Sequence, residues 1–147
     1  MSQYMVTAPA VVCLLMAASA LPAHAQASKI TTVAGTGAEG YAGDNGAATS
    51  ATLKAPRGLA LDSAGDLIIA DPGCHCIRKV YATCTIVTFA GNGMAGCSGD
   101  NGAAAVATLN SPVGVGVDGA DNVYVVDMDN HTVRTVTPGG RISAFAG

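Results

Sequence analysis

Charged and aromatic side chains are scarce in this chain of 147 residues. Only 12% of the residues are charged, 4% are aromatic and none is tryptophan. Seven lysines and arginines against ten aspartates and glutamates give a net charge of −3. Nucleic-acid grooves depend on basic side chains and aromatic stacking, and anionic membranes attract basic segments. The composition therefore argues against a nucleic-acid partner and against a basic membrane-binding tail.

The common catalytic motifs are missing as well. The sequence contains no Gly-x-Ser-x-Gly segment, no His-Glu-x-x-His segment and no phosphate-binding loop. We therefore assign no catalytic, cofactor-binding or metal-binding residue, and we expect no cofactor. The sequence leans against an enzyme without deciding the question.

Residues 1–25 have no charged side chain and include the apolar run Val11–Ala18. This run is too short for the ~20 residues of a membrane-spanning helix. Ala23-His24-Ala25 fits the small-x-small pattern of a cleavage site. We predict a signal peptide over 1–25 and a mature domain over 26–147, with no membrane span after cleavage. The protein would then be secreted or periplasmic, with an uncleaved anchor as the alternative.

The remaining chain contains a duplicated unit. When residues 30–85 are aligned with residues 86–141, 23 of the 56 pairs are identical and no gap is needed. Chains of ordinary composition match by chance at about one position in sixteen. The segment Gly-Asp-Asn-Gly-Ala-Ala recurs at 43–48 and 99–104, and a third unit begins at Ile142.

Each unit contains four short apolar segments separated by Gly, Pro, Asp and Asn, a pattern typical of strands joined by turns. The second of them, 67–70 and 123–126, are apolar throughout, so both faces of each sheet must be covered. The blades of a β-propeller meet this requirement by stacking around an axis; a solenoid of strands is the alternative. The predicted strands are Gly58–Asp62, Asp66–Asp71, Cys76–Tyr81, Ile86–Ala90, Gly114–Asp118, Asn122–Asp127, Thr132–Thr137 and Ile142–Ala146.

Four segments carry a family resemblance: Pro56–Asp62, Asp66–Asp71, His75–Val80 and Asn130–Arg134. Through them residues 30–147 resemble NHL-repeat β-propellers, and the Gly-Asp-x-Gly segment resembles the long repeat of exported bacterial proteins. The resemblance implies an all-β chain of two four-stranded antiparallel blades. The pattern departs at 47 and 103, where Ala replaces Pro, and at Cys74, where the second unit has Asn.

The predicted ring is incomplete. A propeller needs about four to eight blades, whereas this chain supplies two blades plus an extra outer strand, because 30–34, 86–90 and 142–146 are equivalent. The surplus strand falls at Ile142–Gly147 and favours part of a larger propeller over a self-assembled trimer. Open blade faces would expose apolar side chains, which mark an interface, so an oligomer through these faces is a further expectation.

Two recurring pairs, Asp71 with Arg78 and Asp127 with Arg134, lie symmetrically about the turn between the second and third strands. We predict that each forms a structural ion pair across its hairpin; a ligand-facing role for the arginines is the alternative. The Gly-Asp-Asn-Gly segments lack the spacing of a calcium loop and predict turns held by their Asp and Asn side chains.

Four cysteines follow the predicted cleavage site, and an even number in an exported chain suggests disulfides. Cys97 follows a strand that runs back toward Cys74 and Cys76, so we predict a bridge from Cys97 to one of these two. Cys84 lies about five strand residues, or ~17 Å, away, and the sequence does not indicate its role.

The repeated blades favour a binding or scaffold module that presents loops to a protein, peptide or glycan ligand, by resemblance of fold alone. The candidate binding loops contain His75, His131, Asp129 and Asn130. The alternative is a fragment of a propeller enzyme, a metal-dependent lyase or lactonase, because the resemblance extends to propellers whose metal ligands come from several blades. A third interpretation is a gene fragment without independent function.

Overall fold

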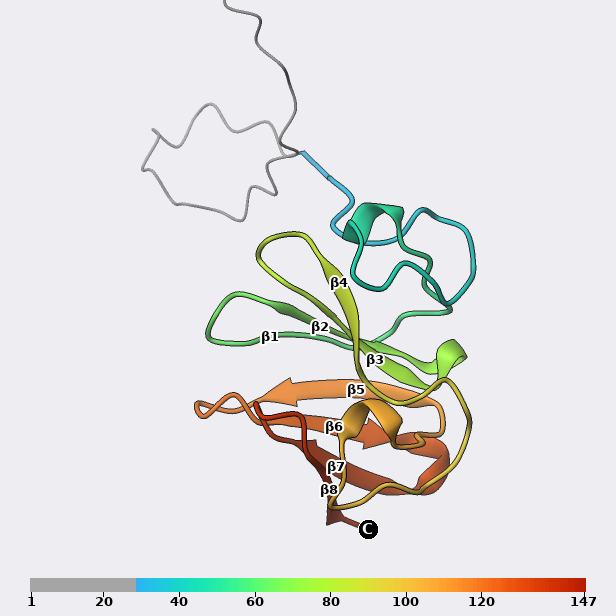
Figure 1. Ribbon diagram of the computed structural model, residues 1–147, viewed down its shortest axis with the longest axis vertical. Coiled ribbons are helices and arrows are strands. Elements are labelled where there is room, and N and C mark those ends of the chain that lie inside the picture. The colour runs from blue at the N-terminus through green and yellow to red at the C-terminus, as the bar shows by residue number, and fades with distance from the viewer. Residues whose placement is uncertain (1–28) are drawn as a thin grey trace, which may run out of the picture.

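The computed structural model describes residues 29–147, which fold into two four-stranded antiparallel sheets stacked on each other (Figure 1). The first blade consists of β1 (Leu59–Leu61), β2 (Leu67–Asp71), β3 (Cys76–Val80) and β4 (Ile86–Ala90). The second consists of β5 (Pro112–Val117), β6 (Val123–Asp127), β7 (Thr132–Val136) and β8 (Ile142–Ala146). The predicted all-β fold of two propeller-type blades in an incomplete ring is confirmed. The predicted signal peptide lies outside the described residues.

A long loop precedes each blade and adds a short ladder to that blade's outer strand. The backbone amide of Asn45 donates to the Ile86 carbonyl at 2.8 Å, and the Ile86 amide donates to Gly46 at 3.1 Å. In the second blade Asn101 donates to Ile142 in the same way at 2.7 Å. Each loop also contains one short 3-10 helix, η1 (Ala48–Ser50) or η3 (Ala104–Val106). The recurring Gly-Asp-Asn-Gly segments therefore pair with the first residues of β4 and β8 and cover the beginning of each outer edge.

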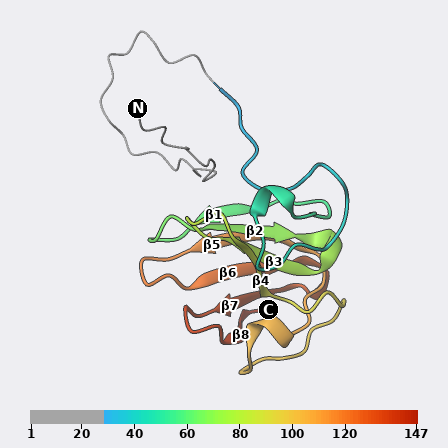
Figure 2. The ribbon, with the colours of Figure 1, turned by 45° about the horizontal axis from the view of Figure 1, so that its top comes forward.

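The main core joins the two blades, which lie one on the other in Figure 2, and the loop that carries η3 contributes side chains to it. The first blade contributes side chains of β2, β3 and β4 to this core. The second blade contributes side chains of β6, β7 and β8 from the face that is turned toward the first blade. A smaller core packs the other face of the first blade against the loop that carries η1. The members of the main core are Ile68, Ala70, Ile77, Ala90, Ala104, Ala107, Leu109, Val123, Val125, Val136 and Ile142.

The extra outer strand is not present in the described part of the chain. Ile142–Ala146 pairs with β7 and completes the second blade, so it is not surplus. The unpaired equivalent is 30–34, which adopts no regular structure. The physical reason is that a strand needs a neighbour to satisfy its backbone groups, and among residues 29–147 no strand pairs with residues 30–34. Each blade is thus built from consecutive strands.

Within residues 29–147, no helix is long and apolar enough to cross a membrane.

Candidate binding surface

The two arginines of the third strands are clamped by aspartates from the preceding loops. Arg78 Nη2 lies 2.6 Å from Asp44 Oδ1, and Arg134 Nη2 lies 2.7 Å from Asp100 Oδ1. Both arginine side chains are buried. A register shift occurs beside each arginine, after Ile77 in β3 and after Val133 in β7. Such bulges change the direction in which a side chain points. At these two bulges the arginine side chain points toward the loop that contains its aspartate partner.

The hairpin partners proposed from sequence are close to the arginines but are not equivalent. Asp127 Oδ2 lies 3.6 Å from Arg134 Nη1. The described residues include no ion pair within 4.0 Å between Asp71 and Arg78; Arg78 binds Asp44 instead. Burial raises the pKa of Asp71, while the Lys54 amide and the charge of Arg78 lower it to a smaller extent. The Asp44 and Asp100 side chains thus bind arginines, whereas sequence reasoning had them hold their own turns.

The two histidines occupy matching turns but have different surroundings. The turns are η2 (Pro72–Cys74) and η4 (Met128–Asn130), and the residue after each, His75 or His131, is left-handed with φ of 52° or 57°. His75 Nδ1 accepts a hydrogen bond from the Ser111 amide at 3.1 Å. His131 is exposed. The first histidine therefore joins the two blades, and the second faces outward.

Of the other two predicted loop residues, Asn130 is structural and Asp129 is exposed. Asn130 Nδ2 donates to the Gly96 carbonyl and to Asp127 Oδ2, both at 2.7 Å. The Asp129 amide donates to Asn110 at 3.1 Å, so the backbone of this turn is fixed while the Asp129 side chain projects from it.

The cysteines pair differently from the prediction. Cys74 and Cys76 are bonded to each other across the left-handed His75, with their Cα atoms 5.3 Å apart. Cys97 is exposed as a free thiol in the loop before the second blade. The turn at His75 brings its two neighbours within the Cα separation that a disulfide requires, which a strand direction alone does not reveal.

Asp71, Cys74 and Cys76 place ligand atoms within 4.8 Å of one another. Both sulfurs belong to the disulfide, and metals bind the thiolate form of cysteine. The cluster in this state therefore offers a metal ion one carboxylate. Asp71 Oδ1 is buried without a hydrogen-bond partner. In the second blade Asn130 donates a hydrogen bond to Asp127, whereas its equivalent in the first blade is Cys74, which has no side-chain amide group to donate.

A third charged cluster lies near the opposite end of the first blade. Lys79 Nζ is 2.8 Å from Asp62 Oδ2 and 3.0 Å from Asp66 Oδ2. Burial opposes ionisation of Lys79, but the hydrogen bonds to these two carboxylates outweigh it and raise the pKa of Lys79. The second blade has Asn122 and Thr135 at the equivalents of Asp66 and Lys79. This cluster was not identified from the sequence.

One exposed polar group occurs in the first blade only. Tyr41 hydroxyl lies 3.0 Å from Thr88 Oγ1, and Thr88 donates to Asp44 Oδ2 at 2.7 Å. The Arg78 guanidinium lies 5.2 Å from the centre of the Tyr41 ring. We call Tyr41, Asp44 and Thr88 the polar rim. Its signal in the sequence is a difference between the units: Cys97 and Ala144 replace Tyr41 and Thr88.

Several solved structures with similar folds come from Bacteroides thetaiotaomicron. An auxiliary nutrient binding protein matches with 26% identity and a TM-score of 0.58, over 76% of this chain and 28% of its own. A putative phosphatase matches with 26% identity and a TM-score of 0.56, over 78% of this chain and 26% of its own. A protein of unknown function matches with 22% identity and a TM-score of 0.56, over 67% of this chain and 24% of its own.

These similarities support a propeller-like fold. The chain spans about a quarter of the length of the structures it matches. No protein-family model matches the sequence, and no curated protein matches it.

Proposed function

We propose that this chain is an exported binding module of the NHL-repeat type, secreted or periplasmic, that works within a larger propeller. The polar rim of the first blade is the ligand surface, and a hydroxyl-rich ligand such as a glycan fits it best among the protein, peptide and glycan ligands that the fold accommodates.

The observation that carries the proposal is the contrast between the two blades. The arginine–aspartate clamp recurs in both, so it serves a need that every blade shares. Tyr41 and Thr88 occur in one blade only and add two hydroxyl groups beside Asp44, which is as exposed as its equivalent Asp100, at 40% each. Residues that a repeat does not need for its fold are the better candidates for recognition.

The chemistry of the rim suits a ligand rich in hydroxyl groups. Asp44 Oδ2 is an ionised acceptor, and hydrogen bonds to charged groups are about twice as strong as neutral ones. Because Thr88 donates to Asp44, the Tyr41 hydroxyl donates to Thr88, and the oxygen atoms of this group keep lone pairs that can accept from ligand hydroxyls. The Tyr41 ring is partly exposed and offers an apolar surface beside these polar groups. Asp44 is held in place by its contacts with Arg78 and Thr88, and a preformed site loses less entropy on binding.

The matching nutrient binding protein supports a binding role by analogy, since it is 26% identical over 76% of this chain. The analogy is of fold and partial sequence, and the ligand itself has to be found by experiment.

The test is binding of the purified chain to an array of neutral oligosaccharides and to an array of synthetic peptides. A hit is then measured by calorimetry for the protein and for Tyr41→Phe, which removes one hydroxyl and keeps the ring, and Thr88→Val. We expect each variant to weaken binding about tenfold, the effect of losing one hydrogen bond at a site. Cys97→Ala changes the equivalent of Tyr41 in the second blade and should bind normally.

Binding that is equally strong in Tyr41→Phe, Thr88→Val and Cys97→Ala would show that the rim is not the site. Stoichiometric Ca²⁺ or Zn²⁺ in the purified protein, with no array hit, would favour the alternative of a fragment of a metal-dependent lyase or lactonase.

A further inference from the structure

The joint between the two blades contains a specific set of contacts. The left-handed His75 accepts the hydrogen bond from Ser111, which is itself left-handed with φ of 52°. Pro112, next to Ser111, is buried. The apolar part joins Ile68, Ala70 and Ile77 on one side to Leu109 and the second blade on the other. One side of this joint thus belongs to the first blade, and the other to a loop and the second blade.

The two ends of the described chain repeat the two sides of this joint. The residues of the first side have equivalents one repeat unit later in the sequence, and these equivalents lie on the outer face of the second blade. There Val126 is 43% exposed, whereas its counterpart Ala70 is 0% exposed. The residues of the second side have equivalents one repeat unit earlier, and these lie on the outer face of the first blade. There Leu59 and Leu61 are 62% and 60% exposed, whereas Val115 and Val117 pack against the core.

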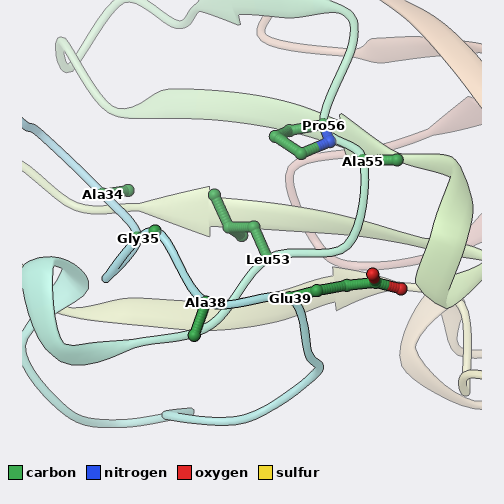
Figure 3. A pocket seen from close by; sticks show the side chains of 8 residues that line it. Ala34, Gly35, Ala38, Glu39, Leu53, Ala55 and Pro56 are labelled. Carbon is green, nitrogen blue, oxygen red and sulfur yellow. The ribbon is translucent and has the colours of Figure 1, made fainter.

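A hollow marks each of these faces. The hollow on the first blade is lined by residues of two loop segments, 34–39 and 53–56, which include Leu53, Ala55 and Pro56 (Figure 3). The hollow on the second blade is lined by η4 and the ends of β6, β7 and β8, and it includes His131 and Val133. Within the joint, the equivalents of these two linings touch each other at His75 and Ser111. The two hollows are therefore the two halves of one kind of contact.

The polar groups of that contact are present at both ends. His131 has the left-handed conformation of His75, with φ of 57°, and is exposed. Ala55 has the left-handed conformation of its equivalent Ser111, with φ of 64°, and is exposed. Only a backbone amide is needed at this position, so alanine serves as well as serine. A left-handed alanine costs about 1–2 kcal/mol, which makes its presence in an exposed loop informative.

The backbone at Gly58, just before β1, lies so close to β5 that only glycine fits there. A Cβ on Gly58 would lie 2.7 Å from the Val113 carbonyl and 2.8 Å from Gly114 Cα. Gly114 is the equivalent of Gly58 and also lacks a side chain on the outer face of the second blade, although Val126, the equivalent of Ala70, lies beside it, with its Cγ2 3.3 Å from where a Cβ would be. There it would meet the counterparts of Val113 and Gly114, which are Arg57 and Gly58.

We propose that a second copy of this chain docks head to tail, with the outer face of its first blade on the outer face of the second blade. The His131 Nδ1 of one copy then accepts a hydrogen bond from the Ala55 amide of the next, and Leu59 and Leu61 cover Val126 and Val133. A contact between two different faces gives a ring when its rotation closes. Further copies thus supply the blades that a propeller requires, independently of the ligand proposed above.

Two features distinguish the copy-to-copy contact from the joint. Ser63 donates to Asp121 from its amide at 2.8 Å and from its hydroxyl at 2.5 Å. Gly119 and Gly65 are the equivalents, so these bonds are not repeated and the contact between copies is weaker. Residues 30–35 and 142–147 are both equivalent to 86–91, and β8 already occupies the place beside β7. The irregular segment 30–34 of the docking copy therefore moves aside.

The first test is the mass of the full chain by sedimentation velocity over a range of concentrations, for the protein and two valine variants. Val126→Asp places a charge on the proposed contact. Val106→Asp is the matched control, because Val106 is 68% exposed on η3 and lines neither hollow. We expect discrete multiples of the monomer mass for the protein and for Val106→Asp. Burying an unpaired carboxylate is costly, so association of Val126→Asp should weaken by at least about tenfold.

The second test identifies the contact by cross-linking. One batch carries Ala55→Cys and another carries His131→Cys, both in a Cys97→Ala background. Oxidation of the mixture should give a dimer that joins position 55 of one copy to position 131 of the other. The fold of each variant is followed by circular dichroism, so that loss of association is separated from unfolding.

A folded protein that stays monomeric at high concentration would overturn the proposal, and the outer faces would then belong to blades of another chain. Equal association of Val126→Asp and Val106→Asp would also overturn it. So would oxidation of the mixed cysteine variants that gives no dimer joined between positions 55 and 131.

Discussion

The carboxylate of Asp44 lies 2.6 Å from the guanidinium of Arg78, and the same contact joins Asp100 to Arg134 at 2.7 Å. In both pairs the aspartate belongs to a long irregular loop and the arginine to the third strand of a blade. The arginines also approach backbone carbonyls of the loops, at 3.4 Å for Thr52 and 3.5 Å for Ser98. Each clamp therefore attaches the long loop before a blade to the sheet of that blade.

Asp44→Ala should lower the free energy of unfolding. Removing one partner of a fully buried pair costs about 3–5 kcal/mol. The Asp44 side chain is 40% exposed, so solvent screens part of this effect, and we expect about 1–2 kcal/mol. Urea denaturation measures the change. The control is Glu39→Ala, which removes an exposed pair with Lys54 at 3.8 Å and should change stability by less than about 1 kcal/mol. Equal effects of the two variants would contradict a clamp.

The two aspartates at the ends of β2 and β6 should respond oppositely to replacement by asparagine. Burial raises the pKa of Asp71 against the smaller effects of Lys54 and Arg78. An acid whose folded-state pKa is raised favours folding at low pH and loses that contribution as pH rises through the raised value. Asp71→Asn should therefore raise stability at neutral pH, by up to about 1 kcal/mol, and change little near pH 3.

Asp127→Asn should lower stability at neutral pH, because Asp127 accepts from the Asn110 amide and Asn130 and lies 3.6 Å from Arg134. Urea denaturation at both pH values measures the two variants. A loss of stability in Asp71→Asn at neutral pH would contradict the assignment of an unfavourable buried charge.

Asp118 should titrate with a pKa of about 2, because it accepts hydrogen bonds from the Asn122 side chain and amide, with smaller contributions from the Ala120 amide and Tyr124 hydroxyl. A lowered folded-state pKa stabilises the fold above the ordinary value of 3.8, and this stabilisation is lost as pH falls toward 2. Asn122→Ala should raise the pKa of Asp118, and Tyr124→Phe should raise it less. The carboxyl carbon shift in NMR measures all three proteins. Identical titrations in the parent and Asn122→Ala would refute this origin of the shift.

The strands were predictable because they depend on local pattern. β4 and β8 have the predicted bounds, and the other six differ by one or two residues at one or both ends. β5 begins earlier than predicted, at Pro112, because this residue pairs with Asp127 before a register shift. The repeat also predicted which residues are equivalent. Equivalence was enough for the fold class, since each blade repeats the same alternation of strands and turns.

The side-chain contacts were less predictable, because they join distant parts of the chain. Asp44 and Arg78 lie far apart in the sequence, with the same separation as Asp100 and Arg134. This constant spacing was visible in the sequence. Choosing Asp44 rather than Asp71 as the partner of Arg78 requires the path of the loop, which no local propensity specifies. The bulge beside Arg78 could not be predicted for the same reason, because a register shift depends on the neighbouring strand.

The pairing of the cysteines gives a direct chemical test of the turn at His75. Alkylation of the native protein without reductant should label Cys97, which is exposed as a thiol. Cys74 and Cys76 should resist labelling and appear in one peptide with an internal disulfide, because the turn places their Cα atoms 5.3 Å apart. Mass spectrometry of a digest distinguishes this pairing from the bridge predicted by strand direction. Cys97→Ser should lose the label and retain the disulfide, whereas a peptide that joins Cys97 to Cys74 or Cys76 would contradict the structure of this turn.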